Sequence, residues 1–463
     1  MLLGLYGIVL IGISVRRLLA GIPGLFDLGW MVAGLRAVSD HGPLAPIPWS
    51  GISLLENHFS PALLPLSHVG RLDEAGVVLV AIQVLSVVGG VALLWFAFRS
   101  MSVPPRADRL LITAGLALHP ALLYAAFFDV HSNVIAVLPV AAMCWGLICR
   151  NGPLVAVSAL AAALLREDVA LLVILLLAAH FGLVRSMRIV WVPLIVAVLA
   201  GLWGLTLRDE IALVGLLGAS SSRNLFQFAG DSLSNFWDRG LAISTLVTLS
   251  FPWILVRRVD HRFWIPVAAA FLPLLFLANA VTRTPSFHYF ALAPLVLAFG
   301  CAKSLVHGSV EDRTPRVVAW IAVGVLTLSG PLGLDLYGRS GFRNSLQDVV
   351  DVPVSEFEQF AELRHALGCL EPNDSASVDP RLVPWSGGSP AVLPLPLPFE
   401  DLRFDIAGGS IVMMEAGLSV EPDAVISTKP PARVASSYHR DPDLFDLWWR
   451  DPARSCDNRL LEE

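Results

Sequence analysis

The chain has 463 residues, of which 55% are hydrophobic and only 15% are charged, and its formal net charge is −6. Soluble globular proteins carry about 25% charged residues, so this composition excludes an ordinary water-exposed surface and indicates a polytopic membrane protein. The net charge itself says little, because the distribution of charge decides how a membrane protein is oriented. No nucleic acid partner is expected.

Apolar runs near the roughly 20 residues needed to cross hydrocarbon recur through residues 1–333. They predict an all-α transmembrane domain of about 11 helices. Arginine clusters at 99–109 and 257–262 are typical of cytoplasmic loops, which places the long loops 21–74 and 207–240 outside. The run at 153–165 is short for a span, and a tilted or re-entrant pair with the run at 168–184 remains an alternative to two full spans.

Residues 334–463 differ in composition and predict a small α/β C-terminal domain on the extracytoplasmic side. Apolar residues at helical spacing indicate an amphipathic helix over 353–369. Short β-like runs follow at Ala376–Val378, Ser410–Met414 and Ala424–Ser427. Cys369 and Cys456 lie in this region and could pair, but their spacing alone does not decide it.

The first external loop carries three candidate site residues. Asp27, at the outer end of a hydrophobic segment, suits a general base that accepts a proton from a hydroxyl group; the simpler alternative is a cap of the helix beginning near Leu28. Glu56 and His58 precede Phe59-Ser-Pro61. Their simpler role is a polar helix start with Ser60 as cap, since Pro61 can open a helix.

Three further polar groups interrupt apolar segments on the predicted external side, and each also has a bland explanation. For Asp129 and His131 the bland explanation is a simple external turn. For Arg166, Glu167 and Asp168, the second group, it is a local ion pair of Arg166 with a neighbouring carboxylate. For Arg283 and His288 it is an interfacial Arg and Tyr belt. Charges at a membrane boundary are costly and tend to be functional, which favours a functional role for the second group. The candidate residues of the three groups are Asp129 and His131; Arg166, Glu167 and Asp168; and Arg283 and His288.

Five motifs in this order resemble an uncharacterised prokaryotic integral membrane family, domain of unknown function 2079. They are Phe26-Asp-Leu-Gly29, His58-Phe-Ser-Pro61, Phe128-Asp-Val-His131, Arg166-Glu-Asp168 and His288-Tyr289. The family pattern has an aromatic residue where this chain has Val130 and lysine where it has Arg166. The resemblance covers about residues 20–430 and implies a protein of the cytoplasmic membrane of a prokaryote.

That family in turn resembles GT-C-type glycosyltransferases, which take a sugar from a polyprenyl-phosphate carrier. The resemblance implies that Asp27 is the catalytic base and that a glycan or protein of the cell envelope is the acceptor. Arg166, Arg283 and His288 would stabilise the leaving lipid phosphate. Five other candidates would hold the acceptor or a divalent cation, the one cofactor left open: Glu56, Asp129, His131, Glu167 and Asp168. His58 is a further candidate for substrate binding.

Two other functions remain open. The same residues could bind the substrate of a transporter or flippase, although transporters usually place such groups near the bilayer midplane, between internal repeats, and no repeat is visible here. The chain could also be an envelope assembly scaffold whose external domain binds a partner. The absence of a Gly-rich phosphate loop fits a transferase that uses lipid-linked sugars.

Overall fold

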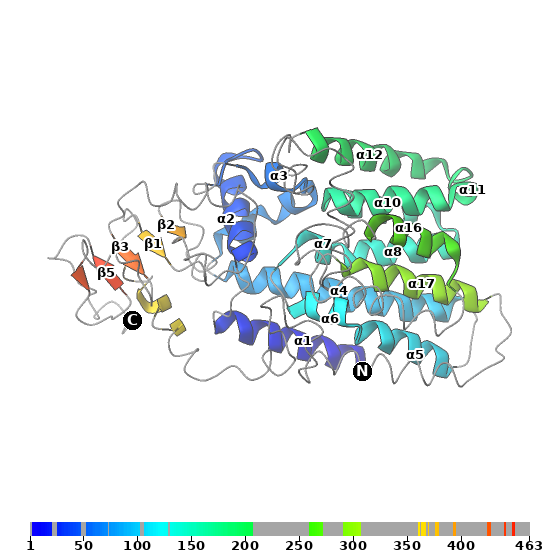
Figure 1. The fold of residues 1–463 in the computed structure, drawn as a ribbon, viewed down its shortest axis with the longest axis horizontal. Helices are drawn as coiled ribbons and strands as arrows, with labels where there is room; N and C mark the ends of the chain where they lie inside the picture. Colours follow the sequence, from blue (N-terminus) through cyan, green and yellow to red (C-terminus); the bar gives the residue numbers. More distant parts are fainter. Residues whose placement is uncertain are drawn as a thin grey trace, which may run out of the picture. The chain divides into compact units, whose positions relative to one another are not determined.

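A computed structural model describes the backbone over residues 2–20, 26–47, 52–72, 74–101, 106–127, 130–206, 259–271 and 290–306, with parts of 360–369 and five short strands between 376 and 449. The described part is mostly helical (Figure 1). It divides into two compact units. The first comprises residues 1–11, 58–62 and 81–350, and the second comprises 12–57, 63–80 and 351–463.

The first unit is a bundle of apolar helices. Within it α8 packs on α9, α9 on α10 and α12, α10 on α16, and α16 on α17. Small residues permit close contact at several crossings; Gly146 of α8, for example, faces Val155 of α9. The described elements of this unit are α5 (Arg106–Ala117), α6 (Pro120–Phe127), α7 (Ser132–Ile135), α8 (Val137–Cys149), α9 (Gly152–Ala163), α10 (Glu167–Ala179), α11 (Phe181–Val184), η2 (Arg188–Val190), α12 (Trp191–Thr206), α16 (His261–Phe271) and α17 (Leu292–Val306). The unit also includes the first part of α1 (Leu2–Leu19) and α4 (Ala75–Ser100) from Ala81 on.

Two helical stretches among the described residues are long and apolar enough to cross a membrane, Ala75–Ser100 and Ser132–Cys149. Shorter apolar helices include Gly152–Ala163, and its Val157 is 69% exposed. Such outward apolar side chains fit lipid better than water, so the structure supports membrane association. The predicted number of about 11 spans stays a prediction, and loop 207–240 lies outside the described residues.

The first predicted external loop is largely folded, and it contributes to the second unit. It contains α2 (Phe26–His41), α3 (Leu54–Asn57) and the 3₁₀ helix η1 (Pro61–Arg71). Arg71 donates to Asp40 at 2.7 and 2.9 Å and to the Ser39 carbonyl at 3.0 Å. This hydrogen-bonded guanidinium lowers the pKa of Asp40. The backbone of α2 and that of η1 approach so closely at Gly70 that a β-carbon there would lie 2.5 Å from the Arg36 nitrogen.

The C-terminal region contains five short strands in one sheet, in the order β2-β1-β3-β5-β4. Strand β1 pairs in parallel with β2 and β3, whereas β5 pairs antiparallel with β3 and β4. Strands β1 and β3 coincide with two of the predicted runs, and the run at 410–414 lies outside the described residues. The strands are β1 (Ala376–Val378), β2 (Val392–Pro394), β3 (Ala424–Ile426), β4 (His439–Arg440) and β5 (Leu447–Trp449).

Before the sheet, helical residues occur between 360 and 366. Phe360, Leu363 and Ala366 are buried there, as expected for the apolar face of the predicted helix. Cys369 takes part in a disulfide, whereas Cys144, Cys149 and Cys301 are free thiols. Cys456, the suggested partner, lies outside the described residues. The separate extracytoplasmic α/β domain stays a prediction.

Candidate functional site

The candidate site forms where the chain turns from α9 into α10. Helix α9 ends with Leu164 as its C-cap, and Arg166 follows in extended conformation as the N-cap of α10. Glu167 and Asp168 therefore occupy the first helical turn, where the positive end of the helix dipole stabilises carboxylates. The break in an otherwise apolar sequence thus collects three charged side chains at one helix end.

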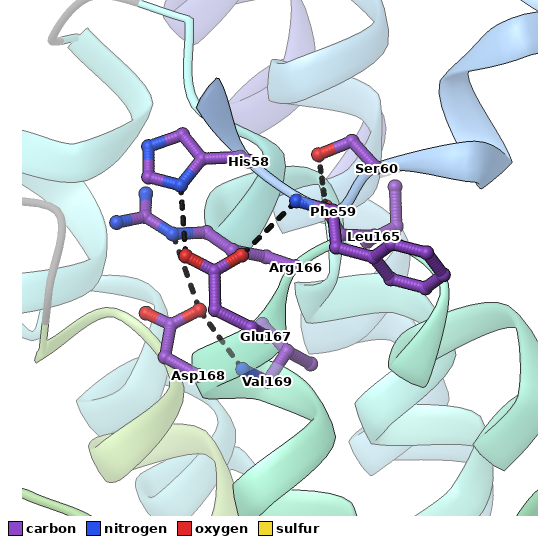
Figure 2. A network of polar contacts seen from close by, with 8 residues as sticks. All are labelled: His58, Phe59, Ser60, Leu165, Arg166, Glu167, Asp168 and Val169. Atoms are coloured by element: carbon purple, nitrogen blue, oxygen red, sulfur yellow. Dashed lines mark hydrogen bonds and ion pairs between the residues drawn. The ribbon is translucent and has the colours of Figure 1, made fainter. Parts of the chain in front are cut away.

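A short segment of the first loop binds to this turn. Glu167 holds it with both carboxylate oxygens, because Oε1 lies 2.9 Å from His58 Nδ1 and Oε2 accepts the Phe59 N–H at 3.2 Å. Ser60 Oγ donates to the Leu165 carbonyl at 2.7 Å. The Ala62 N–H donates to the Leu164 carbonyl at 3.0 Å. Figure 2 shows the contacts of His58, Phe59 and Ser60 with this turn, with the second ring nitrogen of His58 directed away from Glu167.

Arg166 is the most buried charge of the turn. Its side chain is only 7% exposed, and Nε lies 3.2 Å from Oδ1 of Asp168, whose side chain is 45% exposed. The same oxygen of Asp168 accepts the Val169 N–H at 2.9 Å. A buried guanidinium needs such compensation because desolvation strongly disfavours an isolated charge. The local Arg166–Asp168 pair weighed as a structural alternative is therefore present.

His131 joins this cluster from the turn between α6 and α7. Its backbone N–H donates to Gln83 Oε1 at 2.8 Å, and Gln83 Nε2 donates to the Ala125 carbonyl at 3.1 Å. Gln83 thus fixes the turn from within the apolar helix α4. Burial lowers the pKa of His131 well below its ordinary 6.5, and the charges on Arg166 and His58 lower it further. His131 is accordingly a neutral imidazole at pH 7.

This pKa shift predicts how stability depends on pH. A histidine whose pKa is lowered by folding binds its proton more readily in the unfolded chain, so its stabilising contribution is present above about pH 6.5 and falls on acidification. We expect His131→Gln to flatten the decline in unfolding temperature between pH 7 and pH 5, by the effect of about one proton. The measurement is thermal unfolding in detergent across that range.

The matched control for this experiment is His68→Gln. His68 is exposed, so its replacement should leave the pH dependence of the parent protein unchanged. An equally steep decline in the His131 variant and the parent would contradict the assignment of a neutral, buried imidazole.

The other predicted residues fall elsewhere. Glu56 belongs to the second unit and forms a capping box with Ser53, in which Glu56 Oε2 accepts the Ser53 N–H at 2.6 Å and Ser53 Oγ accepts the Glu56 N–H at 3.2 Å. This reciprocal pairing is a structural role. Asp27 lies in α2, but its side chain is outside the described part. Asp129, Arg283 and His288 also lie outside the described residues.

Sequence reasoning missed two polar residues of the first unit. Gln83 is the one amide side chain in the apolar run 75–98, and this interruption is a signal that the sequence contained. His180 is also buried within an apolar run, where its Nδ1 lies 2.9 Å from the Leu176 carbonyl. It lies near the opposite end of α10 from Glu167, so it does not belong to the same site.

The arrangement brings a guanidinium, a carboxylate-bound imidazole and a buried neutral imidazole to one place. These groups can bind an oxyanion, hold a hydroxyl group and carry a proton. No group of three or more metal-binding side chains occurs among the residues that the structure describes. A scan against protein-family models found no match, and searches of curated proteins and of solved structures likewise returned no similar protein.

Proposed function

We propose that the chain is a GT-C-type glycosyltransferase that moves a sugar from a polyprenyl-phosphate donor to a glycan or protein of the cell envelope. The observation that carries the proposal is the convergence of His58, His131 and the Arg166–Asp168 turn, which are far apart in the sequence. The proposed location is the cytoplasmic membrane of a prokaryote, with the site and the C-terminal domain on the outer side.

The position of this cluster supports transfer over transport. His131 directly precedes the apolar span Ser132–Cys149, and Glu167 begins α10, so both lie at helix ends. Transporters usually bind their substrates near the bilayer midplane, at broken helices. A cluster at helix ends, contacted by the first loop, suits a reaction at the membrane boundary.

In the proposed reaction the carboxylate of Asp27 removes the proton of an acceptor hydroxyl group. The hydroxyl oxygen attacks the anomeric carbon as the bond from that carbon to the phosphate oxygen breaks. The electron pair of the broken bond leaves with polyprenyl phosphate. Arg166 supports this step because a guanidinium can donate two parallel hydrogen bonds to a phosphate, and His58, held by Glu167, can donate or accept one more.

Asp27→Asn tests the proposed base. The protein, reconstituted in liposomes, is supplied with a panel of synthetic polyprenyl-phosphate hexoses, and the release of polyprenyl phosphate is measured. Since general base catalysis contributes about 10²–10⁴-fold, we expect a fall of at least about 100-fold with an unchanged unfolding temperature.

Glu74→Gln is the control, because Glu74 is an exposed carboxylate of the same loop, and it should retain the parent rate. Full activity of the Asp27 variant would refute the base assignment. Uptake of a labelled hexose lipid without release of polyprenyl phosphate by the parent protein would favour transport instead.

A further inference from the structure

The end of the helical unit opposite the candidate site carries five arginines, which we call the basic rim: Arg99, Arg150, Arg185, Arg188 and Arg262. Side-chain contacts bring their helix ends together. Trp145 Nε1 of α8 donates to Ser100 Oγ of α4 at 3.3 Å. The rings of His180 and Phe263 lie 4.9 Å apart and connect the end of α10 to α16.

Two further contacts complete the rim. Gly152 at the start of α9 packs against Met187, next to η2. Phe181 of α11 meets Trp191 of α12 edge to face, with 6.2 Å between ring centroids. In Figure 1 the label of α11 and the far end of α17 mark this end of the bundle. The rim is thus one surface and not a set of separate loops.

The rim carries positive charge that no ion pair neutralises among the side chains that the structure describes. All five arginines are exposed, and none forms an ion pair among the described residues. The acidic side chain described at this end is Asp260, which lies 3.1 Å from Lys303 Nζ and 3.7 Å from His261 Nδ1 and accepts the backbone N–H of Arg262 at 2.9 Å. Three arginines outside the rim differ in this respect, since Arg36 and Arg71 share Asp40 and Arg166 binds Asp168.

Exposed apolar side chains flank these arginines. Phe181 is 50% exposed, Trp264 47% and Ile265 46%. Tryptophan beside basic residues is typical of the level where lipid headgroups meet hydrocarbon. A water-soluble anion would need only the charge, whereas this combination fits a ligand with a charged head and an apolar body.

Arg150 adds an independent observation. It caps α8 in the left-handed region, with φ of 56°, a position at which glycine is the usual residue because a β-carbon is strained there. It is the one non-glycine residue with positive φ among the described residues. The chain therefore retains a charged side chain where glycine would give a more stable backbone.

We propose that the basic rim binds the headgroups of anionic phospholipids. Guanidinium groups match phosphate with paired donors, and clustered basic residues at the membrane surface attract anionic lipid, each contributing about a fivefold gain in affinity. The neighbouring Trp191, Trp264 and Phe181 contact the region below the headgroups. This surface lies at the other end of α10 from Glu167 and acts independently of the proposed transferase.

The test is a titration of the full-length protein in dodecyl maltoside with mixed micelles of phosphatidylglycerol or phosphatidylcholine, followed by thermal unfolding. Phosphatidylglycerol should raise the unfolding temperature of the parent protein at concentrations where phosphatidylcholine does not. The variant R185Q/R188Q/R262Q should require about 100-fold more phosphatidylglycerol for the same shift. Added salt should weaken the effect in the parent protein.

R16Q/R36Q is the matched control, because it removes two arginines outside the rim, and it should keep the response of the parent. Arg150→Gly provides a further readout: it should raise the unfolding temperature without lipid and yet lower the affinity for phosphatidylglycerol. If Arg150 had only a structural role, its replacement would change the unfolding temperature without lipid but not the affinity for phosphatidylglycerol. The proposal would be overturned if phosphatidylglycerol and phosphatidylcholine stabilised the parent equally, or if inorganic phosphate alone stabilised it as much as phosphatidylglycerol. Equal stabilisation of the triple variant and the parent by phosphatidylglycerol would also overturn it.

Discussion

Gly70→Ala is expected to destabilise the protein by about 3 kcal/mol, at the upper end of the range for overpacking. The added β-carbon would lie 2.5 Å from the Arg36 nitrogen, 2.9 Å from the Leu35 carbonyl carbon and 3.0 Å from the Arg36 α-carbon. All three atoms belong to the backbone of α2, which cannot move aside as a side-chain end can. The change should appear as a lower unfolding temperature.

Gly12→Ala is the matched control, since it makes the same substitution in α1 at a position where a β-carbon meets nothing within 4 Å. It should leave stability unchanged or raise it by about 0.5–1 kcal/mol, because glycine is unfavourable inside a helix. If the two variants unfold at the same temperature, the close approach of η1 to α2 is not a feature of the folded protein.

Glu167→Ala is expected to cost about 2–3 kcal/mol and to release the segment from His58 to Ala62. One side chain accepts from the Phe59 N–H and bonds His58 Nδ1, and hydrogen bonds to a charged group are each worth about 1.5–3 kcal/mol. The two bonds would sum to about 3–6 kcal/mol, and the expected cost lies at or below the lower end of that sum because water partly compensates for their loss where Glu167 is 17% and His58 27% exposed. Thermal unfolding and the rate of proteolysis near residue 58 measure the two effects.

A double-mutant cycle with His58→Ala separates the pair from the rest. We expect a coupling energy of about 1–2 kcal/mol, within the range for residues in direct contact. Glu74→Ala, which removes an exposed carboxylate, should be neutral in both measurements. No coupling between Glu167 and His58 would mean that the hydrogen bond does not hold the loop segment in place.

Local sequence patterns predicted the elements better than their assembly. The apolar runs gave α4 and the stretch 132–149, Pro61 opens η1 as expected, and the pair of short runs corresponds to α9 and α10. The Arg166–Asp168 contact was also foreseeable, because the two residues are two apart at a helix start. Each of these features depends on residues close together in the sequence.

The partners of the candidate site could not be predicted in the same way. His58 and Glu167 are 109 residues apart, and Gln83 reaches His131 across 48 residues. Such pairings depend on how helices pack, which a single sequence does not specify. Glu56 illustrates the opposite case, since Ser53 three residues before it was the visible signal of a capping box. The resemblance to GT-C enzymes and the roles of Asp27, Arg283 and His288 remain predictions.

The shortness of α9 has a consequence for the depth of the site. From its cap Asn151 to its cap Leu164, a rise of about 1.5 Å per residue gives roughly 20 Å, against about 30 Å for a hydrocarbon core. On the proposed placement of Arg150 at the headgroups of one leaflet, a bilayer of ordinary thickness would leave Arg166 about 10 Å short of the opposite headgroups. Because a charge within hydrocarbon is costly, that placement predicts a bilayer that is locally thin, or indented by water, beside α9, which would keep the site at the membrane boundary. A lipid-linked substrate diffusing sideways in that leaflet would reach the site at the level where its phosphate joins its hydrocarbon chain.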